Sequence, residues 1–126
     1  MEFSESLKKN RDFQFIYRNG KSFGNRYLVM YVYLRDTGKN RLGISVSKKV
    51  GNSIVRHRLT RLIRESYRLN EEKFVRGLDL IVIARPGAKG RSYLDIERAL
   101  LHVAAKNKVR ADVQVKQEES NETNSN

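Results

Sequence analysis

Apolar and polar residues follow two different periods along the chain, and each period predicts a different kind of secondary structure. Helical spacing comes first: Phe13, Ile16 and Tyr17 fall on one face when they are placed on a helix. We predict that this helix has Asn10 at its N-cap and ends before Gly20. The chain therefore begins with a short amphipathic helix.

Three later stretches predict β-strands because they are rich in β-branched and aromatic residues. The first two strands are expected at residues 27–34 and 41–47, and the turn-forming sequence RDTGKN between them predicts that they pair as a hairpin. The third, LDLIVIA at residues 78–84, is an almost continuous apolar run after a glycine. Such a run is typical of an interior strand that is buried on both faces.

Helical spacing returns twice in the second half of the chain. One helix is predicted from residue 52 to about residue 69, and another begins at Ser92, which has capping-box spacing with Asp95. The apolar face of the last helix consists of Ile96, Ala99, Leu100 and Val103. The order helix, strand, strand, helix, strand, helix predicts an α+β fold with one mixed sheet and helices packed against it.

The first two predicted strands have two unlike faces, since successive side chains of a strand point in opposite directions. The face predicted to lie in the core consists of Leu28, Met30, Val32, Leu34, Leu42, Ile44 and Val46. The other face consists of Tyr27, Val29, Tyr31, Tyr33, Gly43, Ser45 and Ser47. Tyrosine rings beside small hydroxyl residues suit unstacked RNA bases, although tyrosines are also ordinary strand formers on a solvated face.

The net charge narrows the choice of partner. The chain has 26 basic and 14 acidic residues, a net charge of +12. Its last ten residues hold three acids and no base, so residues 1–116 carry +15. We expect one nucleic-acid-binding domain over residues 1–116 and a disordered acidic tail over 117–126, because so large an imbalance attracts polyanions.

Several classes of protein are excluded or disfavoured by what the sequence lacks. There is no cysteine, which excludes disulfides and Cys-ligated zinc or iron–sulfur sites. No apolar run approaches the roughly 20 residues of a membrane span, and the N-terminus has no apolar signal core. We expect a cytoplasmic protein that does not enter a membrane.

The helix predicted from residue 52 separates into two faces when its residues are spaced at about 100°. The apolar arc consists of Val55, Leu59, Leu62, Ile63, Ser66 and Leu69. The opposite side carries His57, Arg61, Arg64 and Arg68, with Arg58 at its margin and Arg56 on the other flank. Guanidinium groups bind phosphates and stack on bases, and Glu65 alone offsets them here. We therefore predict a nucleic-acid-binding face rather than a solubilising one, which would mix both signs of charge.

A protein-borne active site is not predicted. The acidic residues are scattered, and His57 and His102 are solitary, whereas a metal-dependent nuclease needs clustered carboxylates or histidines. We therefore expect no catalytic residue, no metal site and no cofactor on the protein itself.

Five stretches between Asn10 and Val109 carry a resemblance to a known family: NRDFQFIYRNGKS, YLVMYV, RLGISVSKKVGNSIVRHRLTRLIRES, LDLIVIARPGA and SYLDIERALLHV. They resemble the protein subunit of bacterial ribonuclease P, and SVSKKVGN before an R-x-R-x-x-R-x-x-R helix is the most specific match. The resemblance implies a two-layer α/β sandwich with a left-handed β-α-β crossover. It also implies a ribonucleoprotein whose catalytic RNA, with Mg²⁺, removes the 5′ leader of precursor tRNA. The protein would bind both RNAs, assist cleavage and broaden the range of substrates.

The resemblance also implies site residues. The leader-binding cleft would comprise Phe13, Tyr17, Val29, Tyr31, Ser45, Ser47, Lys48, Arg56 and His57. The catalytic RNA would contact Lys49, Arg58, Arg61, Arg64 and Arg68. Two positions depart from the family's pattern: His57 stands where Asn is usual, and Thr60 stands where Lys is common. These departures leave the role of His57 open and predict weaker phosphate binding at Thr60.

Two other classes of nucleic-acid-binding protein remain as alternatives. A ribosomal or KH-like protein would use the GxxG at Gly87–Gly90, although a KH loop joins two helices and this one follows a strand. A DNA-binding regulator would place the arginine helix in a major groove, but no helix-turn-helix partner is evident. In each case we expect the free protein to be a monomer.

Overall fold

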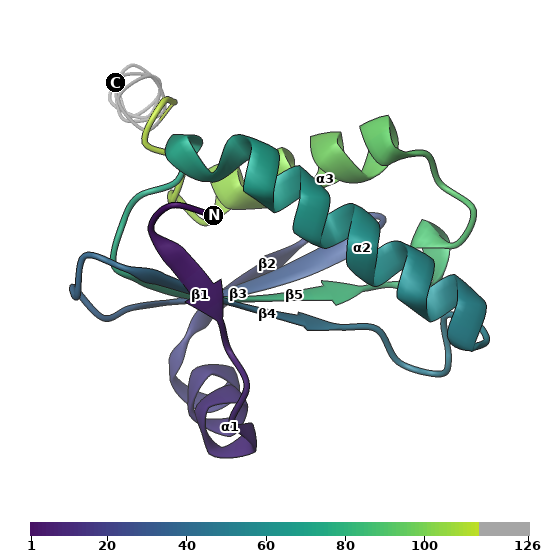
Figure 1. The fold of residues 1–126 in the computed structure, drawn as a ribbon, viewed down its shortest axis with the longest axis horizontal. Coiled ribbons are helices and arrows are strands. Elements are labelled where there is room, and N and C mark those ends of the chain that lie inside the picture. The colour runs from purple at the N-terminus through teal and green to yellow at the C-terminus, as the bar shows by residue number, and fades with distance from the viewer. Residues whose placement is uncertain (114–126) are drawn as a thin grey trace, which may run out of the picture.

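The computed structural model describes residues 1–113, and its helices pack on both faces of a single sheet (Figure 1). The elements are β1 (Ser4–Ser6), α1 (Asn10–Asn19), β2 (Lys21–Gly24), β3 (Leu28–Leu34), β4 (Asn40–Ser45), α2 (Ser53–Asn70), β5 (Leu78–Ala84) and α3 (Tyr93–Lys106). Short 3-10 turns follow α2 and β5, at Glu71–Lys73 and Pro86–Ala88. The predicted tail at 117–126 and the domain boundary at 116 lie outside the described residues.

The sheet is mixed, as predicted, and its strand order is β1-β4-β5-β3-β2. β5 lies in the middle, parallel to β4 and antiparallel to β3. The predicted hairpin of the strands at residues 27–34 and 41–47, which are β3 and β4, is therefore wrong, because β5 is inserted between them. A strand that is apolar on both faces gains most from this central place, where helices cover both of its faces.

The connection from β4 through α2 to β5 has an unusual hand. In Figure 1, β4 and β5 both run to the right with α2 above the sheet, and β1 marks the front edge, so β5 lies behind β4. The chain runs to the right along β4, returns through α2 above the sheet and enters β5 farther from the viewer, and this path is left-handed. Crossovers between parallel strands are right-handed in almost all proteins. The hand agrees with the fold that the resemblance implies.

The two faces of the sheet carry separate cores. α2 and α3 cover one face and α1 covers part of the other (Figure 1). The larger core, under α2 and α3, includes Leu28, Met30, Val32, Leu42, Leu59, Ile63, Leu80, Val82, Ile96 and Leu100. Ile44 and Val46 pack partly buried against it, as predicted, but Leu34 lies at the end of β3 and is 62% exposed. The prediction that Leu34 belongs to the core is wrong.

The boundaries of α1 and α2 match their predicted ranges closely. α1 ends where the Gly20 amide donates to the Ile16 carbonyl, but its N-cap is Lys9 and not Asn10. Asn52 caps α2 by accepting a hydrogen bond from the Val55 amide at 3.0 Å. The first strand β1 was not predicted, because its three residues, SES, carry no apolar signal.

The buried face of α2 is rotated relative to the predicted one near its C-terminus. Leu69, predicted as core, is 53% exposed, while Tyr67 is fully buried. The Tyr67 hydroxyl lies 2.6 Å from the Ser4 hydroxyl and accepts a hydrogen bond from the Asn40 amide. Tyr67 therefore links α2 to the edge strand β1, which provides partners for its polar end.

Candidate nucleic-acid interface

The register of β3, β5 and β4 aligns nine residues in three rows on the face of the sheet that α1 approaches. The first row is Val29, Ile83 and Ser45, the second is Tyr31, Ile81 and Gly43, and the third is Tyr33, Asp79 and Arg41. Because β4 runs from Asn40 to Ser45, the third row lies at its start and the first row at its end. The rows give this face two distinct ends.

Helix α1 packs directly on the second row. Ile16 is fully buried and belongs to the same small core as Ile81. A Cβ atom on Gly43 would lie 2.6 Å from Phe13 Cζ, so the absence of a side chain at this position lets the ring approach the strand. The Tyr17 and Tyr31 rings meet edge to face, with centroids 5.0 Å apart. Aromatic and aliphatic contacts thus fix α1 across the sheet.

The third row is held by charge. Arg41 donates from Nε and Nη2 to the two carboxylate oxygens of Asp79, at 2.8 and 2.7 Å, and from Nη1 to Asp12 at 3.1 Å. Asp79 is almost completely buried, and the bidentate pairing offsets the cost of burying its charge. Arg41 thereby joins β5 to the first turn of α1, a link that sequence analysis did not predict.

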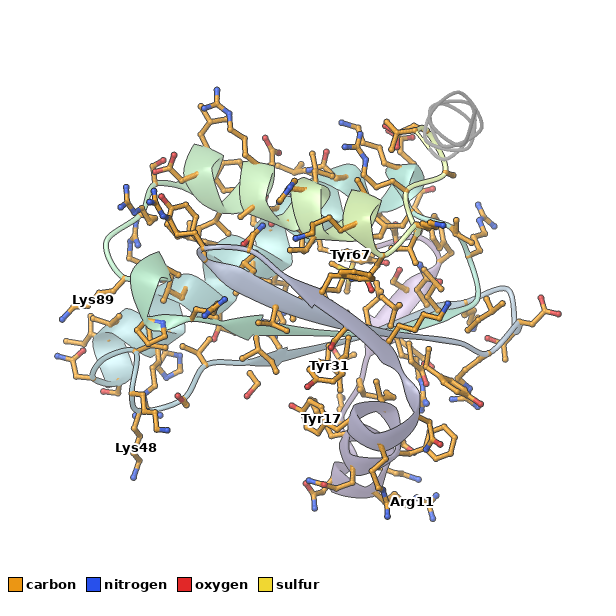
Figure 2. The ribbon with its side chains drawn as sticks, turned by 180° about the vertical axis from the view of Figure 1, so that it is seen from behind. Arg11, Tyr17, Tyr31, Lys48, Tyr67 and Lys89 are labelled. Carbon is orange, nitrogen blue, oxygen red and sulfur yellow. The ribbon has the colours of Figure 1, made fainter. Side chains whose placement is uncertain are left out.

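The first row remains half-buried, with α1 beside it. Ser45, Val29 and Ile83 form this row, and Tyr17 and Tyr31 stand next to it on the α1 side; these five residues are called the first-row surface. Figure 2 shows the Tyr17 and Tyr31 side chains close together between α1 and the sheet. Burial raises the pKa of the Tyr17 hydroxyl, while the neighbouring Ser45 hydroxyl lowers it. Tyr17 is therefore a neutral hydrogen-bonding group at neutral pH.

The basic residues predicted to border this surface lie in the loop after β4 and at the start of α2. Ser47, Lys48 and Lys49 are exposed in that loop, and Figure 2 shows Lys48 on the same side of the sheet as Tyr17 and Tyr31. Arg56 and His57 stand on α2, which covers the opposite face of the sheet (Figure 1). The structure therefore groups Phe13, Tyr17, Val29, Tyr31 and Ser45 directly, whereas Arg56 and His57 are separated from them by the loop.

The outward side of α2 exposes His57, Arg58, Arg61, Arg64 and Arg68, and these residues are called the arginine stripe. Its members differ in how much of their bonding capacity is free. Arg68 is paired with Glu65 through two hydrogen bonds, which lower the pKa of the Glu65 carboxyl. Arg58 donates to the Arg91 carbonyl at 2.8 Å. Within residues 1–113, no ion pair or hydrogen bond engages the guanidinium of Arg61 or Arg64.

Two corrections concern the aromatic face predicted from the strands. Tyr27 precedes β3 and packs against the larger core, with the Arg91 guanidinium 4.9 Å above its ring, so it is not part of the first-row surface. Ile83 is part of that surface but was not predicted. In a continuous apolar strand, hydrophobicity does not distinguish one face from the other, and only the register with Val29 and Ser45 places Ile83.

The described part of the chain has neither a cluster of metal ligands nor a membrane-spanning helix. Among residues 1–113, no group of three or more His, Cys, Asp or Glu side chains is placed to hold a metal ion. None of the helices in this part of the chain is long and apolar enough to cross a membrane. The chemistry that these residues offer is that of a binding surface, with aromatic rings, hydroxyl groups and guanidinium groups.

Comparison with known proteins agrees with this chemistry. The family model described as Ribonuclease P matches residues 1–108. The ribonuclease P protein component of Lachnoclostridium phytofermentans is 58% identical over 106 residues, which are 84% of this chain and 91% of that protein. The corresponding protein of Alkaliphilus metalliredigens is 48% identical over 109 residues, covering 86% and 98%.

Solved structures agree with both the sequence matches and the fold. The RNase P protein of Staphylococcus aureus superimposes with a TM-score of 0.77 at 42% identity, covering 83% of this chain and 96% of that one. The RNase P protein of Thermotoga maritima gives 0.72 at 32% identity, covering 77% and 92%. The chain therefore belongs to the ribonuclease P protein family, whose members are subunits of the ribonucleoprotein that processes the 5′ ends of tRNA and whose catalytic role in bacteria is held by the RNA subunit.

Proposed function

We propose that the first-row surface binds the single-stranded 5′ leader of precursor tRNA. The observation that carries this proposal is the difference between the rows: α1 packs on the second, Arg41 fills the third, and the first stays half-buried beside two tyrosines. Unstacked bases lie on aromatic and aliphatic side chains, and the Ser45 and Tyr17 hydroxyls offer hydrogen bonds to sugar or phosphate. Lys48, on the same side of the sheet, supplies positive charge for the backbone.

We assign contact with the catalytic RNA to the arginine stripe, together with Lys49 in the preceding loop. Partnership with that RNA follows from membership of the family, and the stripe is the surface best suited to it. Arg61 and Arg64 are exposed and make no hydrogen bond or ion pair within residues 1–113, so each can bind a phosphate in a bidentate manner. Arg68 and Arg58 have protein partners to exchange for RNA, and their contribution is smaller.

In this proposal the RNA carries out the cleavage step. The Mg²⁺ ions that activate water and stabilise the leaving oxygen would be held by RNA phosphates, and the protein would neutralise charge and fix the leader. His57 is exposed on α2 and can stack on a base or donate a hydrogen bond, in place of the usual Asn. We place this activity in the cytoplasm, with the protein entering the complex as a monomer.

One substitution in the first row tests the leader assignment. Ser45→Asp puts a negative charge where the leader phosphates would pass, and Leu94→Asp adds the same charge at an exposed position of α3, on the other face of the sheet. Ser45→Asp should weaken binding of leader-bearing precursor tRNA to the holoenzyme about tenfold or more, with mature tRNA unchanged. Leu94→Asp should affect neither. An equal loss for precursor and mature tRNA would refute the assignment.

A further inference from the structure

A second aromatic pair lies at the other end of the sheet face, by the third row. Phe15 is 44% exposed, and its ring meets the Tyr33 ring edge to face with centroids 5.0 Å apart. Phe15 stands two positions from both Phe13 and Tyr17, and residues so spaced do not share a helix face. It therefore points away from the second row. A hollow of about 420 Å³ is lined by this pair and by the exposed Leu34.

A second hollow, of about 530 Å³, adjoins the first and is predominantly basic. Asp12, Arg35 and Arg41 line both hollows, so the two are adjacent. Lys8, Lys9 and Arg11 extend the lining toward the start of α1. Figure 2 shows Arg11 on the side of α1 away from Lys48, which separates this basic region from the loop that borders the first row.

The acidic residues of this region are largely used by internal pairing. Asp12 and Asp79 both accept from Arg41, and Arg35 Nη1 lies 3.7 Å from the Asp79 carboxylate, so the two acidic charges are offset within the protein. Glu5 is the remaining acid lining the second hollow, against the exposed Lys8, Lys9, Arg11 and Arg35. The surface left for a ligand therefore combines net positive charge with exposed aromatic carbon.

We propose that this outer α1 surface, formed by Phe15, Tyr33, Arg35, Lys8, Lys9 and Arg11, binds single-stranded RNA, and that its ligand is a stretch of the leader upstream of the nucleotides held on the first-row surface. Stacking rings beside flexible cations are the combination that binds single strands without reading their sequence. Arginine next to an aromatic pair adds a cation–π component for a stacked base. The inference rests on the proposed binding of the leader to the first row.

The packing of α1 determines the route of the RNA. Ile16 is fully buried and Gly43 carries no side chain beneath Phe13, so no strand of RNA fits between α1 and the sheet. A leader that continues from the first row toward the third row must therefore pass around the outside of α1. The route brings its phosphates to Lys8, Lys9 and Arg11 and its bases to Phe15 and Tyr33. Only a leader long enough to make this passage would reach the outer α1 surface.

A series of precursor tRNAs whose leaders grow one nucleotide at a time tests the proposal. With the unaltered protein in the holoenzyme, affinity should rise in two stages as the leader lengthens. Phe15→Ala should abolish the second stage, with a loss of roughly tenfold for long leaders and no change for short ones. Leu94→Ala, another exposed apolar residue truncated on α3, is the matched control and should leave both stages intact.

The salt dependence gives an independent measurement for the same surface. Arg35→Ala should reduce the slope of log affinity against log salt by roughly 0.7 for long leaders only, the amount expected for one phosphate contact on a single strand. Arg98→Ala, an exposed arginine of α3, should leave the slope unchanged. A loss that is equal for short and long leaders, or no loss at all, would overturn the proposal.

The two proposals fail in distinguishable ways. If Ser45→Asp weakens binding of every leader but Phe15→Ala weakens none, the first-row assignment stands and the outer α1 surface is refuted. If Ser45→Asp has no effect on any leader, the first-row assignment itself is wrong. An effect of Phe15→Ala on mature tRNA would show that the outer α1 surface binds a different part of the RNA, and would also overturn the inference.

Discussion

The first-row surface and the arginine stripe are built in opposite ways. The first-row surface takes its side chains from α1, β3, β4 and β5, and it exists only when the three strands are in register and α1 is seated. The stripe comes from one helix, and the 3.6-residue period of that helix is enough to align it. The first surface therefore depends on tertiary packing, and the second on local structure.

The largest effect is expected from a substitution that weakens the packing of α1 on the sheet. Ile16→Ala removes a fully buried side chain from the small core and should cost about 2–5 kcal/mol of unfolding free energy, measured by urea denaturation. Where the rest of the protein stays folded, affinity for the leader should fall and affinity for the catalytic RNA should not. Leu69→Ala, at an exposed position, should change stability by less than about 0.5 kcal/mol. A parallel loss of both RNA affinities would mean that the two surfaces are not independent.

Breaking the stripe should have the converse result. Arg61→Ala combined with Arg64→Ala removes two exposed side chains that have no partner within residues 1–113, so unfolding free energy should be unchanged. The slope of log affinity for the catalytic RNA against log salt should flatten by about two units, roughly 0.9 for each lost phosphate contact. The leader-dependent difference between precursor and mature tRNA should persist. An unaltered slope would contradict the phosphate role of these arginines.

A single substitution at Glu65 tests whether the arginines of the stripe differ in their availability to RNA. Arg68 donates two hydrogen bonds to Glu65 and lowers its carboxyl pKa, and in the proposed complex this pairing would compete with RNA for Arg68. Glu65→Gln should release Arg68 and steepen the salt dependence by up to about one unit. Glu72→Gln, which removes an exposed acid from the turn after α2, provides the control. If the two variants behave alike, the effect is one of net charge and not of Arg68.

The smallest effect is expected at the hydroxyl of Tyr17. Tyr17→Phe should weaken leader binding by about 0.5–1.5 kcal/mol, the net value of one hydrogen bond, and leave the catalytic RNA unaffected. Burial raises the Tyr17 pKa above its ordinary 10.0, so the hydroxyl stays protonated at every pH below that value. The difference in leader affinity between the variant and the unaltered protein, measured at several pH values, should therefore stay constant from pH 6 to pH 9, because the hydroxyl loses no proton in that range. A difference that changes within this range would assign the effect to another group.

The sequence predicted the three helices and the three longer strands, but not the short strands β1 and β2 or which strands lie side by side. The helices near residues 10 and 52 follow from apolar spacing and capping residues, which are local signals. The hairpin prediction was wrong because the alternation of apolar and polar residues shows which face of a strand is buried but does not show which strand lies beside it. The six residues of RDTGKN suit a hairpin loop, yet the central place belongs to β5.

The same limit applies to the two proposed binding surfaces. The members of the arginine stripe were predicted correctly as one exposed helix face, since a helix aligns its own residues. In the first-row surface, Val29, Tyr31 and Ser45 could be assigned to one face, but Ile83 could not. Leu34 and Leu69 lie where their strand and helix extend beyond the core, and both are exposed. Hydrophobicity alone does not show where a strand or helix is no longer covered by other elements.

The central position of β5 also sets the order in which the protein can fold. β5 is the last strand in the sequence, and both β3 and β4 need it as a neighbour. On the ribosome, β3 and β4 therefore emerge without the strand that joins them, and α2 must follow before Leu78–Ala84 is made. Contacts between distant parts of a chain are slow to form, and this sheet is assembled from such contacts. The pairs β2–β3 and β1–β4 are complete before β5 is made, but the five-stranded sheet can close only when β5 enters the gap between β3 and β4.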